Sequence, residues 1–397
     1  MSERKPSCVT GVDSIRPQKV RLVEVCKVNT TTPPAYEGEK PYVSTGAVIN
    51  SKIEDSQVEY WSYEERPSRA NLFPSKGDIL FAKMQGTRKT LLIDDLNFSA
   101  LYSTGFYALS PQTDKIDVRF LFHYLDSEAF LSAKDRECKG ATQKALNNAG
   151  LCKIRIPLPS LSLQQQIAAR LDRVCEIVTK RRTQLVQLQQ LVKSRFVEMF
   201  GSELEQRRWP MTTVGSVAKV CVGVVIKPTQ YYQTKGVRAF RSLNIGEMCV
   251  KDSDWVFFSE NGHSKNQKSV VHKDDVLVVR SGAPGTACVV PERFDGANAV
   301  DIIIARPDIS KVDPTFLAMF TNMPHGRNQI KNQIGGAAQQ HYNVGGYKSL
   351  NIIAPPLALQ REFAAFVARV DKLAFAARQR RGVAKKMYRA KIQEFFG

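Results

Sequence analysis

The chain has 397 residues, of which 57 are Lys or Arg and 38 are Asp or Glu, so its formal net charge is +19. This length has room for two or three ordinary domains, and so positive a charge makes a polyanionic partner the first hypothesis. The sequence has no apolar run near the roughly 18 residues of a membrane span, no signal-peptide pattern and no Cys-x-x-Cys pair. We therefore expect a cytoplasmic protein with reduced thiols and with neither a membrane segment nor a metal site.

The first part of the chain mixes short strands with a helix. Two β-rich runs, at 77–82 and 104–109, precede a helical stretch at 118–134. A long helix should follow, because residues 161–200 contain no Gly or Pro and Ser160 or Ser162 can cap its start. This order of elements predicts an α+β domain followed by a helix.

The same elements then recur. Residues 140–143 (Gly-Ala-Thr-Gln) match residues 336–339 (Gly-Ala-Ala-Gln), and the same shift of 196 positions carries the Phe-Gly pair at 200–201 onto the pair at 396–397. The corresponding elements of the second copy are β-rich runs at 276–279 and 301–305 and helical stretches at 314–333 and 357–397. We predict two copies of one module. The early part of each copy has diverged, which fits either two different targets or neutral drift of surface loops.

The two long helices share one apolar seam. A spacing that alternates four and three residues is typical of a coiled coil. The seam includes Ile167, Leu171, Val178, Leu185 and Leu188 in the first helix, and Phe363, Val367, Val370 and Tyr388 in the second. We predict that the helices pair as an antiparallel coiled coil with pseudo-two-fold symmetry, which would put the domains at opposite ends of a rod of roughly 55–60 Å. The alternative is that each helix packs only on its own domain.

The positive charge is concentrated in these helical segments. Residues 151–200 carry a net charge of +6 and residues 351–397 carry +7, whereas residues 1–150 carry only +1. We expect the helices to attract phosphates or to face an acidic partner protein.

A polar loop follows a strand in each copy, at 83–89 and at 280–286. The glycines of these loops allow close backbone approach, and their polar side chains supply donors for base edges and phosphates. With other donor-rich positions, the candidate DNA-binding residues are Ser62, Tyr63, Lys83, Gln85, Thr87, Arg88, Lys89, Gln143 and Lys144 in the first copy, and Arg238, Arg241, Asn244, Arg280, Ser281, Thr286, Gln339 and Gln340 in the second. Either loop alone could be an ordinary solvated loop, but their recurrence favours DNA reading.

Motifs of catalysis are not found. The sequence has no Gly-x-x-x-x-Gly-Lys-Ser/Thr or Gly-x-Gly-x-x-Gly loop, and no Asn/Asp-Pro-Pro-aromatic tetrapeptide of amino-methylating enzymes. The pairs Asp94-Asp95 and Asp274-Asp275 could hold Mg²⁺, but a role in turns is favoured. We assign no catalytic residue and no metal ligand.

Several of these segments together resemble one family. They are the Gly-Asp-Ile-Leu strand at 77–80, the Gly-Ala-Thr/Ala-Gln turn, and the Ile-x-Ile-Pro-Leu-Pro segment at 154–159, which leads through Leu-Gln-Gln-Gln-Ile into a helix ending in Phe-Gly. This arrangement is similar to the DNA-specificity subunits of type I restriction-modification enzymes. The second copy departs from it, because Ile-Ile-Ala-Pro-Pro at 352–356 stands in place of the Ile-Pro-Leu-Pro segment. We expect a less regular helix entry there.

The resemblance implies a division of labour. Two target-recognition domains, at 1–159 and 202–356, would each read one half of a bipartite, asymmetric site in double-stranded DNA. Spacer helices at 160–201 and 357–397 would dock two copies of a methyltransferase subunit, and restriction or translocase subunits could join. The chain itself would be non-catalytic and would bind no cofactor, since S-adenosylmethionine, ATP and Mg²⁺ would serve the partner subunits.

Two other functions remain open on the residues alone. A single-chain DNA-modifying enzyme would methylate DNA without partners when given S-adenosylmethionine. A nucleic-acid-binding scaffold for RNA or ribosomes would bind random and specific DNA equally well.

If the paired helices set the distance between half-sites, their length should control the gap in the DNA target. Removing one heptad from both helices shortens them by about 10 Å, which corresponds to about three base pairs. We expect the methylated site, mapped in a host carrying the shortened chain and its methyltransferase, to lose a gap of that size. An unchanged gap would show that the helices are not a ruler.

Overall fold

The computed structural model describes residues 17–202, 208–334 and 341–397. It contains two compact units, of which unit 1 comprises Met1–Arg181 with Arg380–Gly397 and unit 2 comprises Arg182–Gln379. Each unit therefore combines one globular domain with the start of one long helix and the end of the other. The four predicted segments, divided at 159, 201 and 356, follow the helix ends instead and stay a prediction.

Unit 1 contains two four-stranded sheets. The first has the order β2 (Cys26–Asn29), β11 (Phe106–Pro111), β8 (Ile79–Ala82) and β9 (Thr90–Leu92), and all its pairs are antiparallel. The second has the order β6 (Glu59–Trp61), β3 (Lys40–Val43), β10 (Leu101–Ser103) and β7 (Ala70–Leu72), with β10 parallel to β3. Shorter pairs are formed by β4 (Val48–Ile49) with β5 (Lys52–Ile53) and by β1 (Lys19–Arg21) with β12 (Arg155–Pro157).

The central strand β8 is buried on both faces. Successive side chains of a strand point to opposite faces, so Ile79 and Phe81 join the core under the helices while Leu80 and Ala82 join the core between the sheets. The helices of this domain are α1 (Leu22–Val25), α2 (Val118–Leu125), α3 (Glu128–Glu137) and α4 (Asn148–Leu151). The helical stretch predicted at 118–134 is confirmed but is divided into two helices, because Ser127 caps a new helix by accepting a hydrogen bond from the amide of Phe130.

Unit 2 repeats this plan. Its first sheet has the order β14 (Ala218–Val222), β23 (Ile302–Pro307), β20 (Val276–Val279) and β21 (Ala287–Val289), and its second has β15 (Tyr232–Gln233), β19 (Val256–Phe258), β16 (Val237–Phe240) and β22 (Asn298–Ala299). The shorter pairs are β17 (Ile245–Gly246) with β18 (Cys249–Val250) and β13 (Met211–Thr213) with β24 (Asn351–Ile353). The second sheets differ in the place of one edge strand. In unit 1 this strand is β7, beside β10, whereas in unit 2 it is β15, beside β19.

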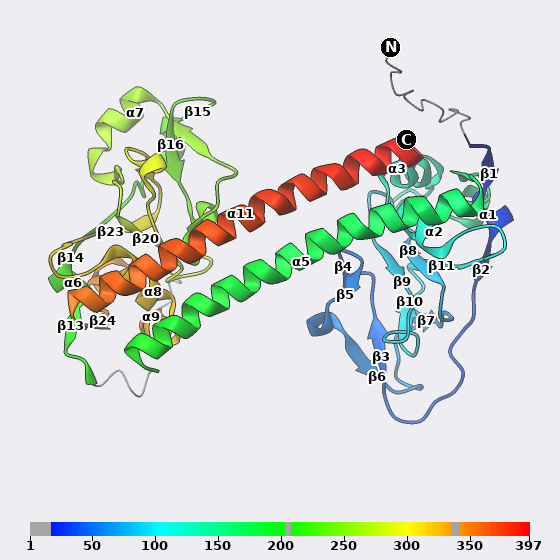
Figure 1. Ribbon diagram of the computed structural model, residues 1–397, viewed down its shortest axis with the longest axis horizontal. Coiled ribbons are helices and arrows are strands. Elements are labelled where there is room, and N and C mark those ends of the chain that lie inside the picture. Colours follow the sequence, from blue (N-terminus) through cyan, green and yellow to red (C-terminus); the bar gives the residue numbers. More distant parts are fainter. Residues whose placement is uncertain (1–16, 203–207, 335–340) are drawn as a thin grey trace, which may run out of the picture. The chain divides into compact units, whose positions relative to one another are not determined.

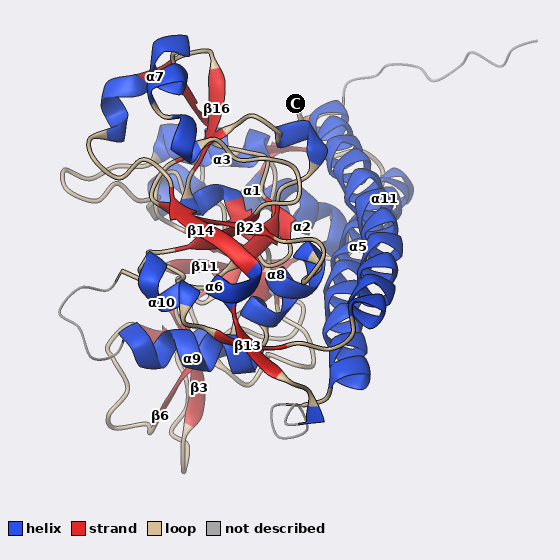
Figure 2. Ribbon diagram, turned by 90° about the vertical axis from the view of Figure 1, so that its left-hand side faces the viewer, coloured by secondary structure: helices blue, strands red, loops and turns tan. Residues whose placement is uncertain are grey.

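Of the five helices in the described part of the second domain, four have counterparts in the first, and the one at 260–265 is additional. These five are α6 (Val214–Val217), α7 (Glu260–Lys265), α8 (Pro314–Asn322), α9 (Pro324–Ile334) and α10 (Val344–Lys348). The helix predicted at 314–333 is divided at Pro324, whose nitrogen cannot donate a helical hydrogen bond. Figure 2 shows α8 between the β14–β23 sheet and the paired long helices. The described residues also form 3₁₀ turns at Asp55–Gln57, Pro228–Tyr231, Ser242–Asn244, Gln267–Ser269 and Glu292–Phe294.

The recurring Asn and Gly after the Gly-Ala-x-Gln turn have a structural cause. Asn147 caps α4 by accepting a hydrogen bond from the amide of Gly150 at 2.9 Å, and Asn343 caps α10 through Gly346 at 2.7 Å. A Cβ atom at Gly150 would lie 2.9 Å from the carbonyl oxygen of Glu137. Glycine is therefore required by close packing at this place.

The long helices, α5 (Leu161–Phe200) and α11 (Leu357–Phe396), each carry a buried glutamine in their first turn. The side-chain oxygen of Gln164 accepts a hydrogen bond from the amide of Asp117 at 2.8 Å, and its nitrogen donates to the carbonyl of Pro159 at 2.9 Å. Gln360 does the same with the amide of Asp313 and the carbonyl of Pro355. The expected irregular entry of the second helix is therefore wrong, because this joint is intact despite the changed prolines.

Each long helix ends on the domain of the other copy. In unit 1 the ring of Phe396 lies 5.1 Å from that of Phe120 on α2, and in unit 2 the ring of Phe200 lies 5.0 Å from that of Phe316 on α8. Gly201 has a φ of +90° and ends α5 with a backbone hydrogen bond to Val197. In the recurring Phe-Gly pair, the Phe therefore anchors the helix on the domain of the other copy and the Gly follows the helix end.

These contacts confirm the antiparallel pairing (Figure 1). The seam residues Ile167, Leu171, Phe363, Val367 and Val370 are buried, and Val178, Leu185, Leu188 and Tyr388 are half-buried. Both helices contribute to the core of each unit, so the alternative in which each packs only on its own domain is wrong. No helix in the described part of the chain is long and apolar enough to cross a membrane.

The joint between α2 and the long helices is polar in unit 1. The buried ring of His123 accepts a hydrogen bond from the hydroxyl of Tyr388 on α11 at 3.0 Å and donates one to Asp172 on α5 at 2.9 Å. Arg119 also binds the carboxylate of Asp172. Burial lowers the pKa of His123, so the neutral ring is the stable form. The shift of 196 places Met319, Ala368 and Val192 at the corresponding positions of unit 2.

This difference should make unit 1 sensitive to acid. The unfolded histidine has a pKa near 6.5 and the folded one a lower pKa, so the unfolded state binds more protons and the stability of unit 1 falls as pH drops below about 6.5. The loss is about 1.4 kcal/mol for each unit by which folding lowers this pKa. We expect His123→Met to flatten the profile between pH 5 and 7 (about the range in which imidazole titrates). Urea unfolding at each pH, followed by fluorine NMR of fluorotryptophan at Trp61, measures the stability of unit 1. An equally steep pH profile in the variant would contradict the role of His123.

The helix ends should stabilise the domains that they reach. Phe396→Ala removes a buried ring from unit 1 and should lower its free energy of unfolding by about 3–5 kcal/mol, whereas Phe375→Ala on the same helix should change little because Phe375 is exposed. The fluorotryptophan signal of Trp61 reports on unit 1, and those of Trp209 and Trp255 report on unit 2. Equal effects of the two substitutions on the Trp61 signal would show that Phe396 is not an anchor.

Candidate nucleic-acid interface

In unit 1 the strand β8 runs directly into the loop at 83–89, and the turn at 139–146 lies beside this loop. The amide of Gln85 donates to the carbonyl of Lys144, and the amide of Leu146 donates to the carbonyl of Lys83, both at 2.9 Å. Gln85, Gln143 and Lys144 are exposed. The structure therefore brings two of the predicted donor-rich segments together on one surface.

The side chains of this loop divide into two groups. Lys83 is half-buried, donates to the carbonyl of Thr104 at 2.8 Å and lies 4.4 Å from the centre of the Tyr107 ring, and burial lowers its pKa. Lys89 donates to the carbonyl of Thr45 at 2.6 Å. These two lysines brace the loop, and Thr87 contributes its backbone. Arg88 is exposed, in an ion pair with the exposed Glu128, which an anionic ligand can replace at low cost.

Beneath the loop lies a buried lysine that the sequence analysis missed. The ammonium of Lys134, on α3, donates to the carbonyls of Ala82, Met84 and Thr87 at 3.2, 2.9 and 2.6 Å. Its side chain is only 1% exposed. A sequence signal was present, because Lys134 lies four residues after the buried Phe130 and so on the inner face of the helix.

In unit 2 the loop at 280–286 follows β20 and meets the segment before α10 in the same way. The guanidinium of Arg280 donates to the carbonyl of Tyr342 at 3.0 Å and pairs with Asp301, and the amide of Tyr342 donates to the carbonyl of Arg280. The hydroxyl of Ser281 contacts the ring of His341. Gln339 and Gln340, predicted for this turn, lie outside the described residues.

A half-buried cation lies beneath this loop. Arg327, on α9, donates to the carbonyl of Pro284 at 2.8 Å, to the hydroxyl of Thr286 at 3.2 Å and to the side-chain oxygen of Asn322 at 3.1 Å. Burial lowers its pKa. The sequence analysis did not select this residue either.

Two predicted contact residues are instead structural. Asn244 is fully buried, and its amide donates to the carbonyl of Ser253 at 2.7 Å and so closes a loop. Thr286 is 9% exposed and donates to the carbonyl of Ala283 at 2.8 Å. Sequence alone could not separate these residues from exposed donors, because a polar side chain that closes a loop has the same composition signal as one that reads DNA.

The remaining predicted residues lie near the second sheets. Ser62 donates to Glu65 at 3.0 Å, and the ring of Tyr63 packs on Tyr36 and beneath the guanidinium of Arg66. Arg241 donates to the carbonyl of Asp254. Arg238 is exposed, 5.9 Å from the centre of the Trp255 ring.

The acidic pairs have roles in turns. The side chain of Asp94 accepts from the amide of Leu96 at 3.0 Å, and Asp275 accepts from the amide of His272 at 2.8 Å. Within the ranges that the structure describes, no three His, Cys, Asp or Glu side chains gather as metal ligands. The cysteines described there are free thiols.

Comparisons of the sequence point to one family. A family model described as "Type I restriction modification DNA specificity domain" matches residues 17–189. The type I restriction enzyme EcoBI specificity subunit of Escherichia coli is 24% identical over 89% of this chain and 72% of its own. The StySPI specificity subunit of Salmonella potsdam is also 24% identical, over 84% of this chain and 75% of its own.

Comparisons of the structure show a shared fold. The type I restriction-modification S subunit from M. genitalium matches with a TM-score of 0.61 and 13% identity, over 97% of both chains. A chain from a study of complex assembly and conformational transition in a type I R-M system matches with a TM-score of 0.54 and 20% identity, over 95% of this chain and 96% of its own. In sequence and in fold, this chain is similar to the DNA-specificity subunits of type I restriction-modification enzymes.

Proposed function

We propose that this chain is the sequence-specific DNA-binding subunit of a type I restriction-modification enzyme, and that each of its domains reads one half of a bipartite site. The observation that carries this proposal is the recurrence of one loop-and-turn pair in both domains. In each case a buried strand ends in a polar loop, and this loop is hydrogen-bonded to the segment before a small capped helix. The exposed donors of such a pair suit base edges in a DNA groove.

The two half-sites should differ in sequence. The first loop presents Gln85 and Arg88 beside Gln143 and Lys144, whereas the second presents Ser281 beside His341. Gln and Arg can form bidentate hydrogen bonds with adenine and guanine, respectively, and the smaller serine cannot. Unlike side chains on matching scaffolds favour an asymmetric target.

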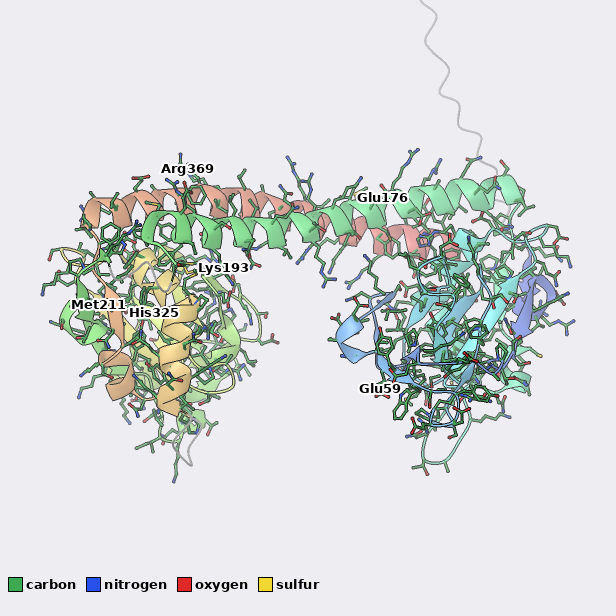
Figure 3. All side chains as sticks on the ribbon, turned by 90° about the horizontal axis from the view of Figure 1, so that it is seen from below. Glu59, Glu176, Lys193, Met211, His325 and Arg369 are labelled. Atoms are coloured by element: carbon green, nitrogen blue, oxygen red, sulfur yellow. The ribbon has the colours of Figure 1, made fainter. Side chains whose placement is uncertain are left out.

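The basic helices supply a second surface. Lys193 faces the domain of unit 2 and pairs with Glu247 at 2.9 Å, whereas Arg369 lies on the face of α11 that is turned away from this domain (Figure 3). Exposed cations on the outer face fit an acidic protein surface or DNA phosphates. On this proposal two methyltransferase subunits dock there, restriction subunits can join, and the partners use S-adenosylmethionine, ATP and Mg²⁺.

The chain would then have no catalytic activity of its own and would act in the cytoplasm. The alternative of a single-chain DNA-modifying enzyme has no specific observation in its favour. Incubating the purified chain with S-adenosylmethionine and DNA, with and without the methyltransferase, separates the two. We expect methylation only when the partner is present.

Loop substitutions should alter one half-site at a time. Each lost base contact costs about 1–3 kcal/mol of discrimination, or roughly tenfold or more. We expect Gln85→Ala combined with Arg88→Ala to relax one half of the methylated site, and Ser281→Ala to relax the other. Mapping methylated bases in a host that carries each variant with the methyltransferase measures this. The two variants control each other, and relaxation of both halves by either one would contradict the assignment of one domain to one half-site.

A further inference from the structure

Each recognition loop rests on a cation that has no place in the recognition chemistry itself, and this cation is buried at Lys134 and half-buried at Arg327. An ammonium group has three N–H donors, and at Lys134 the carbonyls of Ala82, Met84 and Thr87 accept all of them within 3.2 Å. Burying such a charge is costly unless every donor is satisfied. An apolar residue would pack there at lower cost, so the loop backbone is what this lysine serves.

The neighbouring residue completes the grip on the loop. The carboxylate of Asp135 accepts the amide of Gly86 at 3.0 Å, and its own carbonyl accepts the side chain of Gln85 at 3.3 Å. Asp135 lies 3.9 Å from the ammonium of Lys134 and partly balances its charge. Carbonyls and amide of the loop are therefore held from beneath, and the exposed side of the loop is left to side chains.

Unit 2 meets the same need with different chemistry. The guanidinium of Arg327 binds the carbonyl of Pro284 and the hydroxyl of Thr286. It also lies 3.6 Å from Glu247, which pairs with Lys193 on α5. This cation therefore links the second loop to the long helix beside it.

The two cations are not the same position of the repeat. The shift of 196 carries Lys134 onto Ile330, whose side chain packs against Gly285, and carries Leu131 onto Arg327. A cation thus holds the loop in both copies although the helix supplies it from different turns. The recurrence does not follow from duplication alone.

We propose that Lys134 and Arg327 are positioning residues for DNA recognition, which hold the backbone of the loops at 83–89 and 280–286 so that their side chains meet the bases in a fixed orientation. This inference rests on the proposed function of the loops. Neither residue touches DNA itself, so its loss should weaken discrimination between sequences more than it weakens non-specific binding.

The test compares Lys134→Met and Arg327→Lys in the full chain with its methyltransferase. Methionine keeps the length of the side chain without its donors, and lysine keeps the charge of Arg327 without its fork. Arg136→Met and Lys331→Met, at exposed positions of the same two helices, are matched controls. If Lys134→Met does not fold, Lys134→Arg replaces it, since a planar fork cannot satisfy the same three carbonyls equally well.

Two readouts are needed. Amide hydrogen exchange in each loop measures its order, and the preference for the mapped methylation site over a scrambled duplex measures recognition. We expect each variant to speed exchange in its own loop by about tenfold or more and to reduce preference at its own half-site by a similar factor, with the other loop unchanged. The exposed controls should alter neither readout.

Each opposing result has a distinct meaning. Unchanged exchange in the loop above the substituted cation would overturn the positioning role. Faster exchange with full retention of sequence preference would overturn the inference by showing that the ordered loop does not read DNA. If the unsubstituted complex shows no preference for any duplex, the proposed function itself fails, and the inference fails with it.

Discussion

Each domain completes its core with side chains from both long helices, and the rest of the structure depends on this exchange. Phe120 in unit 1 packs on Phe396, which belongs to the helix that follows the second domain, and Phe316 in unit 2 packs on Phe200, which belongs to the helix that follows the first. A domain without the far helix would expose aromatic rings to water. The repeated modules are therefore not independent domains, because each one borrows part of its core from the other copy.

The residues that repeat along the chain are those that maintain this exchange. Gln164 and Gln360 join each helix to its own domain through the same buried hydrogen bonds. The contacts of α2 and α8 with the long helices have diverged. The buried His123 of unit 1 corresponds to the apolar Met319 of unit 2. The joint is thus a polar network in unit 1 and an apolar contact in unit 2.

The sequence was a good guide wherever a pattern repeats over many residues. The seam from Ile167 and its counterpart from Phe363 predicted the paired helices, because burial at regular spacing leaves a signal in every turn. Single side chains were less predictable. Asn244 closes a loop instead of facing solvent, and Lys134 lies in a core although lysine is almost never fully buried without a partner. Both outcomes depend on contacts between residues distant in sequence, which no local pattern records.

The cations beneath the loops also suggest how a recognition surface can change without loss of the fold. A short loop has backbone carbonyls and amides that must be satisfied, and where its own side chains satisfy them, any change of these side chains also changes the path of the loop. In unit 1 that task falls to Lys134 and Asp135 on α3, and in unit 2 it is shared with Arg327 on α9. The path of the loop backbone then depends less on the exposed side chains, of which Gln85 adds one hydrogen bond to the carbonyl of Asp135. On the proposed function, substitution at Gln85 or Ser281 can alter the DNA sequence that is read while the backbone beneath it keeps its course.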